Sequence, residues 1–217
     1  MVSTAQQQAV LASVYLGPAD YYSWLVNRPT IIDPFVFYDR QTFANRCSIV
    51  TSGGVQNLSV PIEKPQPHTP MKKVKIAYTT DWQALHYKAI ESAYNSSPYF
   101  SYFKDELLTI YQTKYDTLFE WNNTLQRKIL QWLGYDNLNV YYADHFVDCA
   151  ENKNCGKIDL RTCIHPKKKC VPLHARCMNP YYQVFQQRFG FVPRLSVLDM
   201  VFNIGREARI LLNENKQ

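Results

Sequence analysis

Hydrophobic positions near the amino terminus follow a strand, helix, strand order. Residues 10–16 form a continuous apolar run that Gly17-Pro18 ends, which predicts a short buried strand. Residues 20–29 carry aromatic and aliphatic side chains at helical spacing, between an aspartate that can cap a helix and a proline that ends it. Residues 31–38 return to an extended apolar pattern with an internal proline, which predicts a second strand at a sheet edge.

The next segment predicts a β-hairpin. Residues 46–50 and 55–62 are extended runs, and the Thr-Ser-Gly-Gly sequence between them supplies the glycines that a tight turn needs. Prolines recur between residues 61 and 70, which predicts a surface loop. Alternation at 74–78 and a short apolar run at 139–143 predict two more strands.

Helices are expected to dominate the middle and the carboxyl end. The segments with helical spacing are 82–94 after the capping residue Asp81, 100–111, 118–132 before Gly134, a short run at 181–188, and 196–212. We therefore expect an α/β fold, with a mixed α+β fold as the alternative. One domain, 1–217, would hold a mixed sheet of about five to six strands, covered by several helices and ending in a C-terminal amphipathic helix.

Composition excludes several classes. None of the seven glycines fits either common phosphate-loop signature, and no apolar run is long enough to span a bilayer. Residues 1–8 contain no basic residue ahead of an apolar core, so we find no signal peptide and expect a cytoplasmic protein.

Charge and cysteine are concentrated in residues 149–177, which we expect to be a basic, Cys-rich loop or insertion. This segment holds seven Lys and Arg against two acidic residues, and five of the six cysteines. No C-x₂₋₄-C knuckle occurs, but His165 and His174 leave open a zinc site built from distant residues. The basic cluster favours an anionic small molecule over nucleic acid, because no aromatic RNA-binding signature accompanies it.

Two groups of residues suggest chemistry. His86, on the predicted helix 82–94, has the character of a general base, although a partly buried histidine bonded to a carbonyl would give the same pattern. Ser196 and Asp199 would suit a serine hydrolase, but their spacing ahead of an apolar run matches a helix cap better.

Taken in order, several motifs resemble the WbqC-like protein family in the form found in Bacteroides-type bacteria. The motifs are Tyr15-Leu16-Gly17-Pro18, Asn45-Arg46, Asp81-Trp82 with His86, Asn95-Ser96-Ser97-Pro98, Asp159-Leu160-Arg161, His165-Pro166-Lys167 and the run from Gly190 to Gly205. The chain departs from the family pattern around residues 168–177. The resemblance implies an enzyme of surface-polysaccharide (O-antigen-type) biosynthesis that transfers an acyl or aminoacyl (glycyl) group to an amino sugar. A non-catalytic binding or scaffold protein associated with glycan enzymes is the alternative, and a metal-stabilised protein is a third.

The resemblance also raises particular residues as site candidates. His86 and Asp199 are the expected catalytic residues. The expected substrate-binding residues are Asn45, Arg46, Trp82, Arg161, Lys167 and Asn203. The expected ligand is a small molecule such as a nucleotide sugar or another anion; no metal ligand, cofactor or oligomeric state is assigned.

Overall fold

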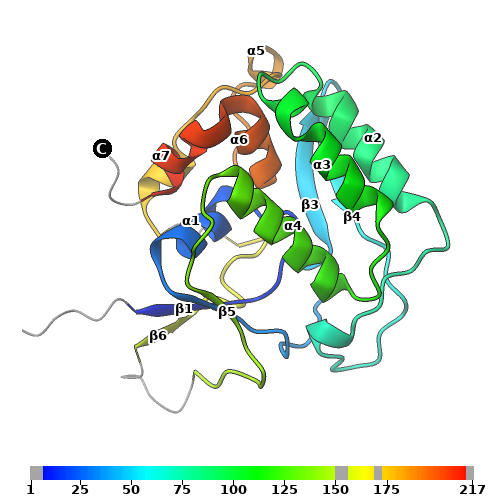
Figure 1. The fold of residues 1–217 in the computed structure, drawn as a ribbon, viewed down its shortest axis with the longest axis vertical. Helices are drawn as coiled ribbons and strands as arrows, with labels where there is room; N and C mark the ends of the chain where they lie inside the picture. The colour runs from blue at the N-terminus through cyan, green and yellow to red at the C-terminus, as the bar shows by residue number, and fades with distance from the viewer. Residues whose placement is uncertain (1–6, 150–155, 169–172, 214–217) are drawn as a thin grey trace, which may run out of the picture.

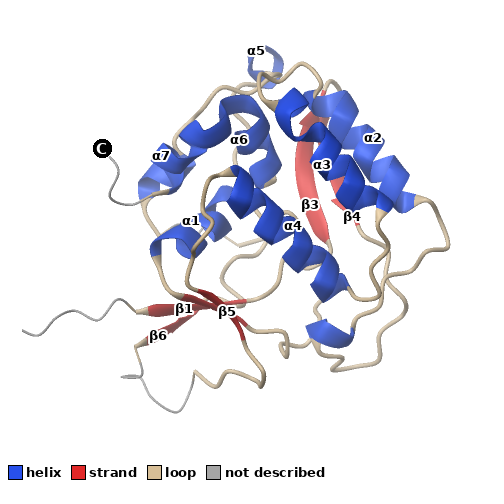
Figure 2. Cartoon of the chain, viewed as in Figure 1, coloured by secondary structure: helices blue, strands red, loops and turns tan. Residues whose placement is uncertain are grey.

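The computed structural model describes residues 7–149, 156–168 and 173–213 and contains two separate sheets. The first is parallel throughout, with strands in the order β5-β2-β1-β6. Its strands are β1 (Gln8–Leu11), β2 (Thr30–Ile32), β5 (Val140–Tyr142) and β6 (Lys157–Asp159). The second is the antiparallel hairpin of β3 (Arg46–Thr51) and β4 (Gly54–Ser59). Figure 2 shows the parallel sheet at the base of the molecule, away from the hairpin.

Helices fill the space between and beside these sheets. The described helices are α1 (Ala19–Asn27), α2 (Trp82–Tyr94), α3 (Phe100–Gln112), α4 (Leu118–Trp132), α5 (Gln186–Phe189), α6 (Val197–Ile204) and α7 (Ala208–Leu212). In Figure 1, α2 and α3 lie beside the hairpin, while α1, α6 and α7 form a group on the other side of α4. The expected α/β class and the C-terminal helices are confirmed. Within the described residues, however, the strands are divided between two sheets, since β3 and β4 pair with each other and not with the parallel strands.

Local sequence signals correctly predicted the hairpin turn, the start of α2 and the end of α4. The hairpin pairs Val50 with Val55, and Gly54 takes a φ of +108° at the turn. Asp81 accepts a hydrogen bond from the amide of Ala84 at 3.5 Å and so caps α2 as predicted. After α4 the chain turns at Gly134 with a φ of +76°, which also matches the prediction.

Three strand predictions were too long or wrong. β1 ends at Leu11 rather than residue 16, because the chain turns away and the amide of Tyr15 donates to the carbonyl of Phe43 at 2.8 Å. β2 ends at Ile32, where the Asp33 side chain accepts from the Phe35 amide at 2.8 Å and forms a turn. Residues 74–78 form only isolated bridges, to Ile62 and Thr117.

Helix starts and ends also differ in places. Asp20 lies inside the first turn of α1 and is buried, so it does not cap that helix; the capping position is Pro18. The short helix expected at 181–188 is confined to α5. The long C-terminal helix is interrupted at Gly205, whose φ is +56°, so α6 and α7 are separate elements.

The expected loop at 149–177 contains a strand, β6, which completes the parallel sheet beside β1. Strands of this length are too short to show an alternating pattern, and this one was therefore not predicted. Cys155 and Cys170 lie outside the described residues.

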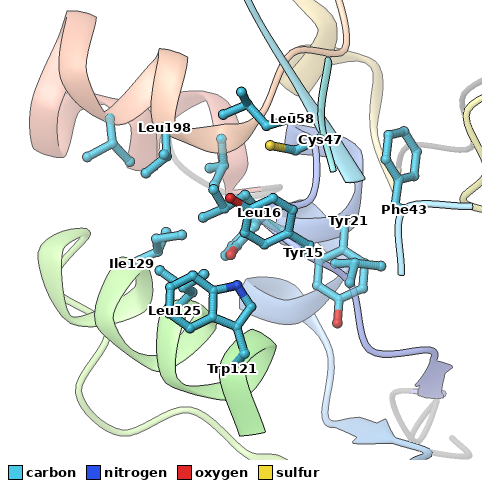
Figure 3. Close-up of a cluster of buried hydrophobic side chains, with 14 of the residues drawn as sticks. Tyr15, Leu16, Tyr21, Phe43, Cys47, Leu58, Trp121, Leu125, Ile129 and Leu198 are labelled. Atoms are coloured by element: carbon cyan, nitrogen blue, oxygen red, sulfur yellow. The ribbon is translucent and has the colours of Figure 1, made fainter. Parts of the chain in front are cut away.

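One aromatic cluster joins the helices to both sheets. Trp121 of α4 is fully buried, and its ring packs edge-on against Tyr111 at 5.0 Å and against Trp82 at 5.2 Å. Figure 3 shows Tyr15, from the loop after β1, in the same cluster as Trp121 and Cys47 of β3. This packing fixes the loop that leaves β1, and that loop forms part of the candidate site.

Candidate functional site

His86, the expected general base, lies in this aromatic cluster. Its Nδ1 is 2.9 Å from the Tyr15 hydroxyl, which is 2.6 Å from the Tyr111 hydroxyl. Trp82 packs edge-on against the imidazole at 5.2 Å and is itself buried. Burial lowers the pKa of His86 to about 4, so the ring is neutral near pH 7. This environment gives both His86 and Trp82 the contacts of core residues.

Asp199, the other expected catalytic residue, is held in a second buried network. Its Oδ2 accepts hydrogen bonds from the Tyr181 hydroxyl at 2.7 Å and from Nε2 of Gln183 at 2.8 Å. Burial raises the pKa of this carboxyl. Ser196 caps α6 by accepting from the Leu198 amide at 3.2 Å, as the spacing predicted. The structure thus uses Asp199 to fasten the segment around Gln183 to α6.

Asn203 belongs to the same network. Its Nδ2 donates to the carbonyl of Asp199 at 2.8 Å, and its Oδ1 accepts from the Ser97 hydroxyl at 3.1 Å. Both ends of the amide are occupied, and the residue is buried. The contacts of Asn203 join α6 to the turn after α2.

A different group of residues surrounds a cavity of about 290 Å³ at the carboxyl ends of the parallel strands. We call it the carboxyl-edge pocket. The residues that line it are Ala12, Ser13, Val14, Asp33, Val36, Phe37, Tyr38, Asp39, Thr42, Phe43, Ala44, Met71, Arg161, Thr162, Ile164, His165 and Lys168. They follow β1, β2 and β6, so three strand ends converge on one space.

The strand order explains why a cavity forms here. β2 and β5 lie on one side of β1, whereas β6 lies on the other side. The segment that follows β1 leads toward β2, and the segment that follows β6 leaves the sheet on the other side of β1, so the two border one crevice at this edge. Open parallel sheets bind their ligands at this kind of switch point.

Arg161 fixes the floor of the pocket. Its Nη1 donates to Oδ2 of Asp33 and to the carbonyl of Val147, each at 2.7 Å. Its Nε and Nη2 donate to the Asp159 carboxylate at 2.9 and 2.6 Å. Four of its five N–H groups are thus used within the protein. Two carboxylates already pair with this guanidinium, which the sequence suggested as a substrate-binding group.

The loop after β6 brings two further polar side chains to the pocket, those of His165 and Lys168. Arg194 holds this loop: its Nη1 donates to the carbonyl of Lys168 at 2.7 Å, and its Nη2 to that of His165 at 3.3 Å. Nδ1 of His165 accepts from the Lys167 amide at 3.1 Å. In the neutral ring Nε2 therefore carries the proton.

The facing wall comes from the segment before β3. Phe43 is buried and supplies an apolar surface, while Thr42 and Asp39 contribute oxygen atoms. The Asp39 side chain is exposed and forms no ion pair with any residue in the described ranges. A carboxylate and an imidazole thus border one cavity. Sequence reasoning did not single out Asp39, and it considered His165 only as a possible zinc ligand and as part of a family-like motif.

The sequence was then compared with known proteins. The family model described as the WbqC-like protein family matches residues 25–168, which is more than half of the chain. The chain belongs to the WbqC-like protein family. An uncharacterised protein of Mycobacterium tuberculosis, Rv1507c, is 25% identical over 225 residues, which cover 92% of this chain and 94% of that protein. No solved structure matches.

Membership of the WbqC-like family suggests a role in polysaccharide biosynthesis. The matched range includes β2, the hairpin, α2 to α4, β6 and the loop that carries His165. It also covers most of the lining of the carboxyl-edge pocket. It ends before Asp199 and Asn203, so those two candidates lie outside the family match.

The remaining candidates lie beside the pocket. Nδ2 of Asn45 donates to the carbonyl of Val60 at 2.9 Å, and Arg46 begins β3. Lys167 is not among the residues that line the carboxyl-edge pocket, and its Nζ donates to Oε1 of Gln41.

The described residues form neither a metal site nor a membrane-spanning helix. No three His, Cys, Asp or Glu side chains within 7–149, 156–168 and 173–213 converge as a metal site would require. Over these residues, no helix is both long and apolar enough to cross a membrane.

Proposed function

We propose that this WbqC-like protein is an enzyme of surface-polysaccharide biosynthesis that transfers an acyl or aminoacyl (glycyl) group to an amino sugar. The carboxyl-edge pocket is the proposed acceptor site. The observation that carries the proposal is the convergence of Asp39 and His165 on one cavity at the switch point of the parallel sheet.

The lining of the pocket suits a monosaccharide. A volume of about 290 Å³ is at the lower end of the range for ligand pockets. Phe43 offers an apolar surface for the face of a sugar ring, and Thr42 and Tyr38 offer hydroxyl groups for its polar edge. The carboxylate of Asp39 would accept a hydrogen bond from the neutral amino group of an amino sugar.

The proposed reaction forms one bond and breaks one. The amine nitrogen attacks the carbonyl carbon of an activated acyl donor, such as a thioester, and forms an amide bond. The bond from that carbon to the leaving group breaks, and the leaving group departs with its electron pair. Asp39 takes up the proton that the amine loses, acting as the general base.

His165 has a complementary role in this scheme. Because its Nδ1 accepts from the Lys167 amide, its Nε2 carries the proton in the neutral ring, and His165 lines the cavity. That proton would stabilise the oxygen of the acyl carbonyl as negative charge develops there. His86, which the sequence suggested as the base, would instead maintain the core beneath the site.

The test combines binding and turnover in the full-length protein. Nucleotide-activated amino sugars are added with acyl or aminoacyl thioesters, and mass spectrometry follows the amide product. We expect Asp39→Asn to lower kcat by about 10²–10⁴-fold. Asp105→Asn, at an exposed position on α3, is the matched control and should retain full activity.

The outcomes separate the competing functions. Turnover that Asp39→Asn reduces and Asp105→Asn does not would support the transferase. Binding of an amino sugar without turnover of any donor would favour a non-catalytic binding protein. Equal turnover by wild type and Asp39→Asn would contradict the assigned base.

A further inference from the structure

A second cavity, of about 430 Å³, shares Tyr38 with the carboxyl-edge pocket. Its lining consists of Tyr38, Arg40, Gln41, Asn45, Arg46, Ile62, Lys64 and Pro65. Three of these side chains are cationic and none is a carboxylate. We call this cavity the cationic groove.

The charges of the groove are not balanced within the described part of the chain. Arg161 and Arg194 both pair with aspartates, but Arg40, Arg46 and Lys64 form no ion pair with residues of the described ranges. Cations that converge without a counter-charge repel one another and attract an anion. The neighbouring Asp39 carboxylate borders the carboxyl-edge pocket instead.

Two polar atoms in the wall of the groove also lack partners. Nε of Arg46 is buried and forms no hydrogen bond, and neither does Oδ1 of Asn45, a residue that is only 8% exposed. The unpartnered N–H of Arg46 is a donor whose missing partner a bound acceptor would supply, whereas Oδ1 of Asn45 is an acceptor and would need a donor from the ligand. The N–H of Arg46 is the type of donor that binds phosphate oxygen.

The segment from Tyr38 to Arg46 separates the groove from the pocket. Asp39, Thr42, Phe43 and Ala44 line the pocket, whereas Arg40, Gln41, Asn45 and Arg46 line the groove. Tyr38 borders both. Burial raises the pKa of its hydroxyl, and the charges of Arg46 and Arg40 oppose that rise, which is consistent with both guanidinium groups lying near this ring.

We propose that the cationic groove binds the phosphate or diphosphate group of a small-molecule ligand through Arg40, Arg46 and Lys64. The groove and the carboxyl-edge pocket are then two halves of one site, and a sugar in the pocket carries its phosphate into the groove. The phosphate-binding step is independent of any transfer reaction. Only the identity of the attached sugar rests on the proposed function.

The first experiment uses pyrophosphate alone as the probe. Isothermal titration of the full-length protein should show binding of pyrophosphate that is tighter than binding of inorganic phosphate and that weakens as NaCl is raised. The double variant Arg40→Gln/Lys64→Gln changes two exposed side chains and should weaken pyrophosphate binding at least tenfold. Lys88→Gln, on the exposed face of α2, is the control and should bind as wild type does.

Each result decides the assignment. Unchanged binding by the double variant, or an equal loss in Lys88→Gln, would overturn the site, and so would a wild type that binds no pyrophosphate. A second titration uses an amino-sugar phosphate. His165→Gln should weaken that ligand while leaving pyrophosphate binding intact, and this holds whether or not the protein catalyses transfer. Equal effects on both ligands would overturn the two-part site but leave the groove.

Discussion

Nη1 of Arg161 lies 2.7 Å from Oδ2 of Asp33, although the two residues are 128 positions apart in the chain. Asp33 follows β2 and Arg161 follows β6, which are the strands on either side of β1. The ion pair therefore reaches across the carboxyl end of β1. It holds together the floor of the carboxyl-edge pocket.

Removing one partner of the ion pair between Arg161 and Asp33 should lower the free energy of unfolding. The side chains of Arg161 and Asp33 are 8% and 0% exposed, so Arg161→Gln leaves a buried carboxylate without its counter-charge. We expect a loss of about 3–5 kcal/mol in the free energy of unfolding, measured by urea denaturation. The double variant Asp33→Asn/Arg161→Gln should be destabilised by less than the sum of the single changes. Strict additivity would contradict a coupled pair.

His86 should make stability depend on pH. Its pKa is about 4 in the folded protein, against about 6.5 for an unperturbed histidine, so the unfolded chain binds its proton first as pH falls. The contribution of the neutral ring is fully present above about pH 6.5. It is lost progressively toward pH 4, by up to about 3 kcal/mol.

The measurement for His86 is a difference between two proteins. His86→Gln cannot titrate, so wild type should lose more stability than this variant between pH 7 and pH 4.5. His145→Gln changes an exposed histidine and should behave as wild type. A wild type and a His86→Gln variant with parallel pH profiles would argue against a buried neutral imidazole.

We expect Asp199 to stabilise the folded protein rather than to act in catalysis. Asp199→Ala leaves the Tyr181 hydroxyl and the Gln183 amide without their acceptor, at a cost of about 2–4 kcal/mol. Asp199→Asn should cost less, because its amide oxygen still accepts. Pyrophosphate affinity, measured by titration below the melting temperature, should not change in either variant. A stable Asp199→Asn protein that binds ligand normally but has lost turnover would restore the catalytic assignment.

Gly205 should be intolerant of a side chain for two separable reasons. Its φ is +56°, and a Cβ placed there would lie 2.8 Å from Cδ1 of Tyr99. Gly190 has a similar φ of +67° but open space around its Cβ position. We expect Gly190→Ala to cost about 1–3 kcal/mol from backbone strain, and Gly205→Ala to cost about 1–3 kcal/mol more from the contact with Tyr99.

Thermal or urea denaturation of the two alanine variants checks this prediction. The difference between them isolates the contact with Tyr99, since both carry a positive-φ strain. Equal destabilisation would mean that the Tyr99 ring moves aside at no cost.

Some elements of this protein follow from the sequence alone. The hairpin follows from Gly53-Gly54 between two extended runs, and α2 follows from its apolar spacing and the Asp81 cap. α4 carries a capping box at Thr117 and Glu120 and ends before Gly134. These features depend on residues a few positions apart, so a local pattern contains the information that specifies them.

The parallel sheet depended on the tertiary structure. The runs at 31–38 and 139–143 indicated β2 and β5, but the three-residue β6 was too short to be recognised, and no local pattern specified which strands pair. Their pairing brings together segments from both ends of the chain. The pocket at their carboxyl ends could not be found before the strand order was known, because three separate loops form it.

The environments of His86 and His165 likewise depended on the tertiary structure. His86 and His165 both lie in motifs that resemble the family, and sequence reasoning preferred His86 because it sat on a well-defined helix. Residue type and spacing specified only that an imidazole was present. Tertiary packing decided its use, since Tyr15 and Trp82 enclose His86 in the core, whereas the loop that Arg194 anchors leaves His165 at the cavity.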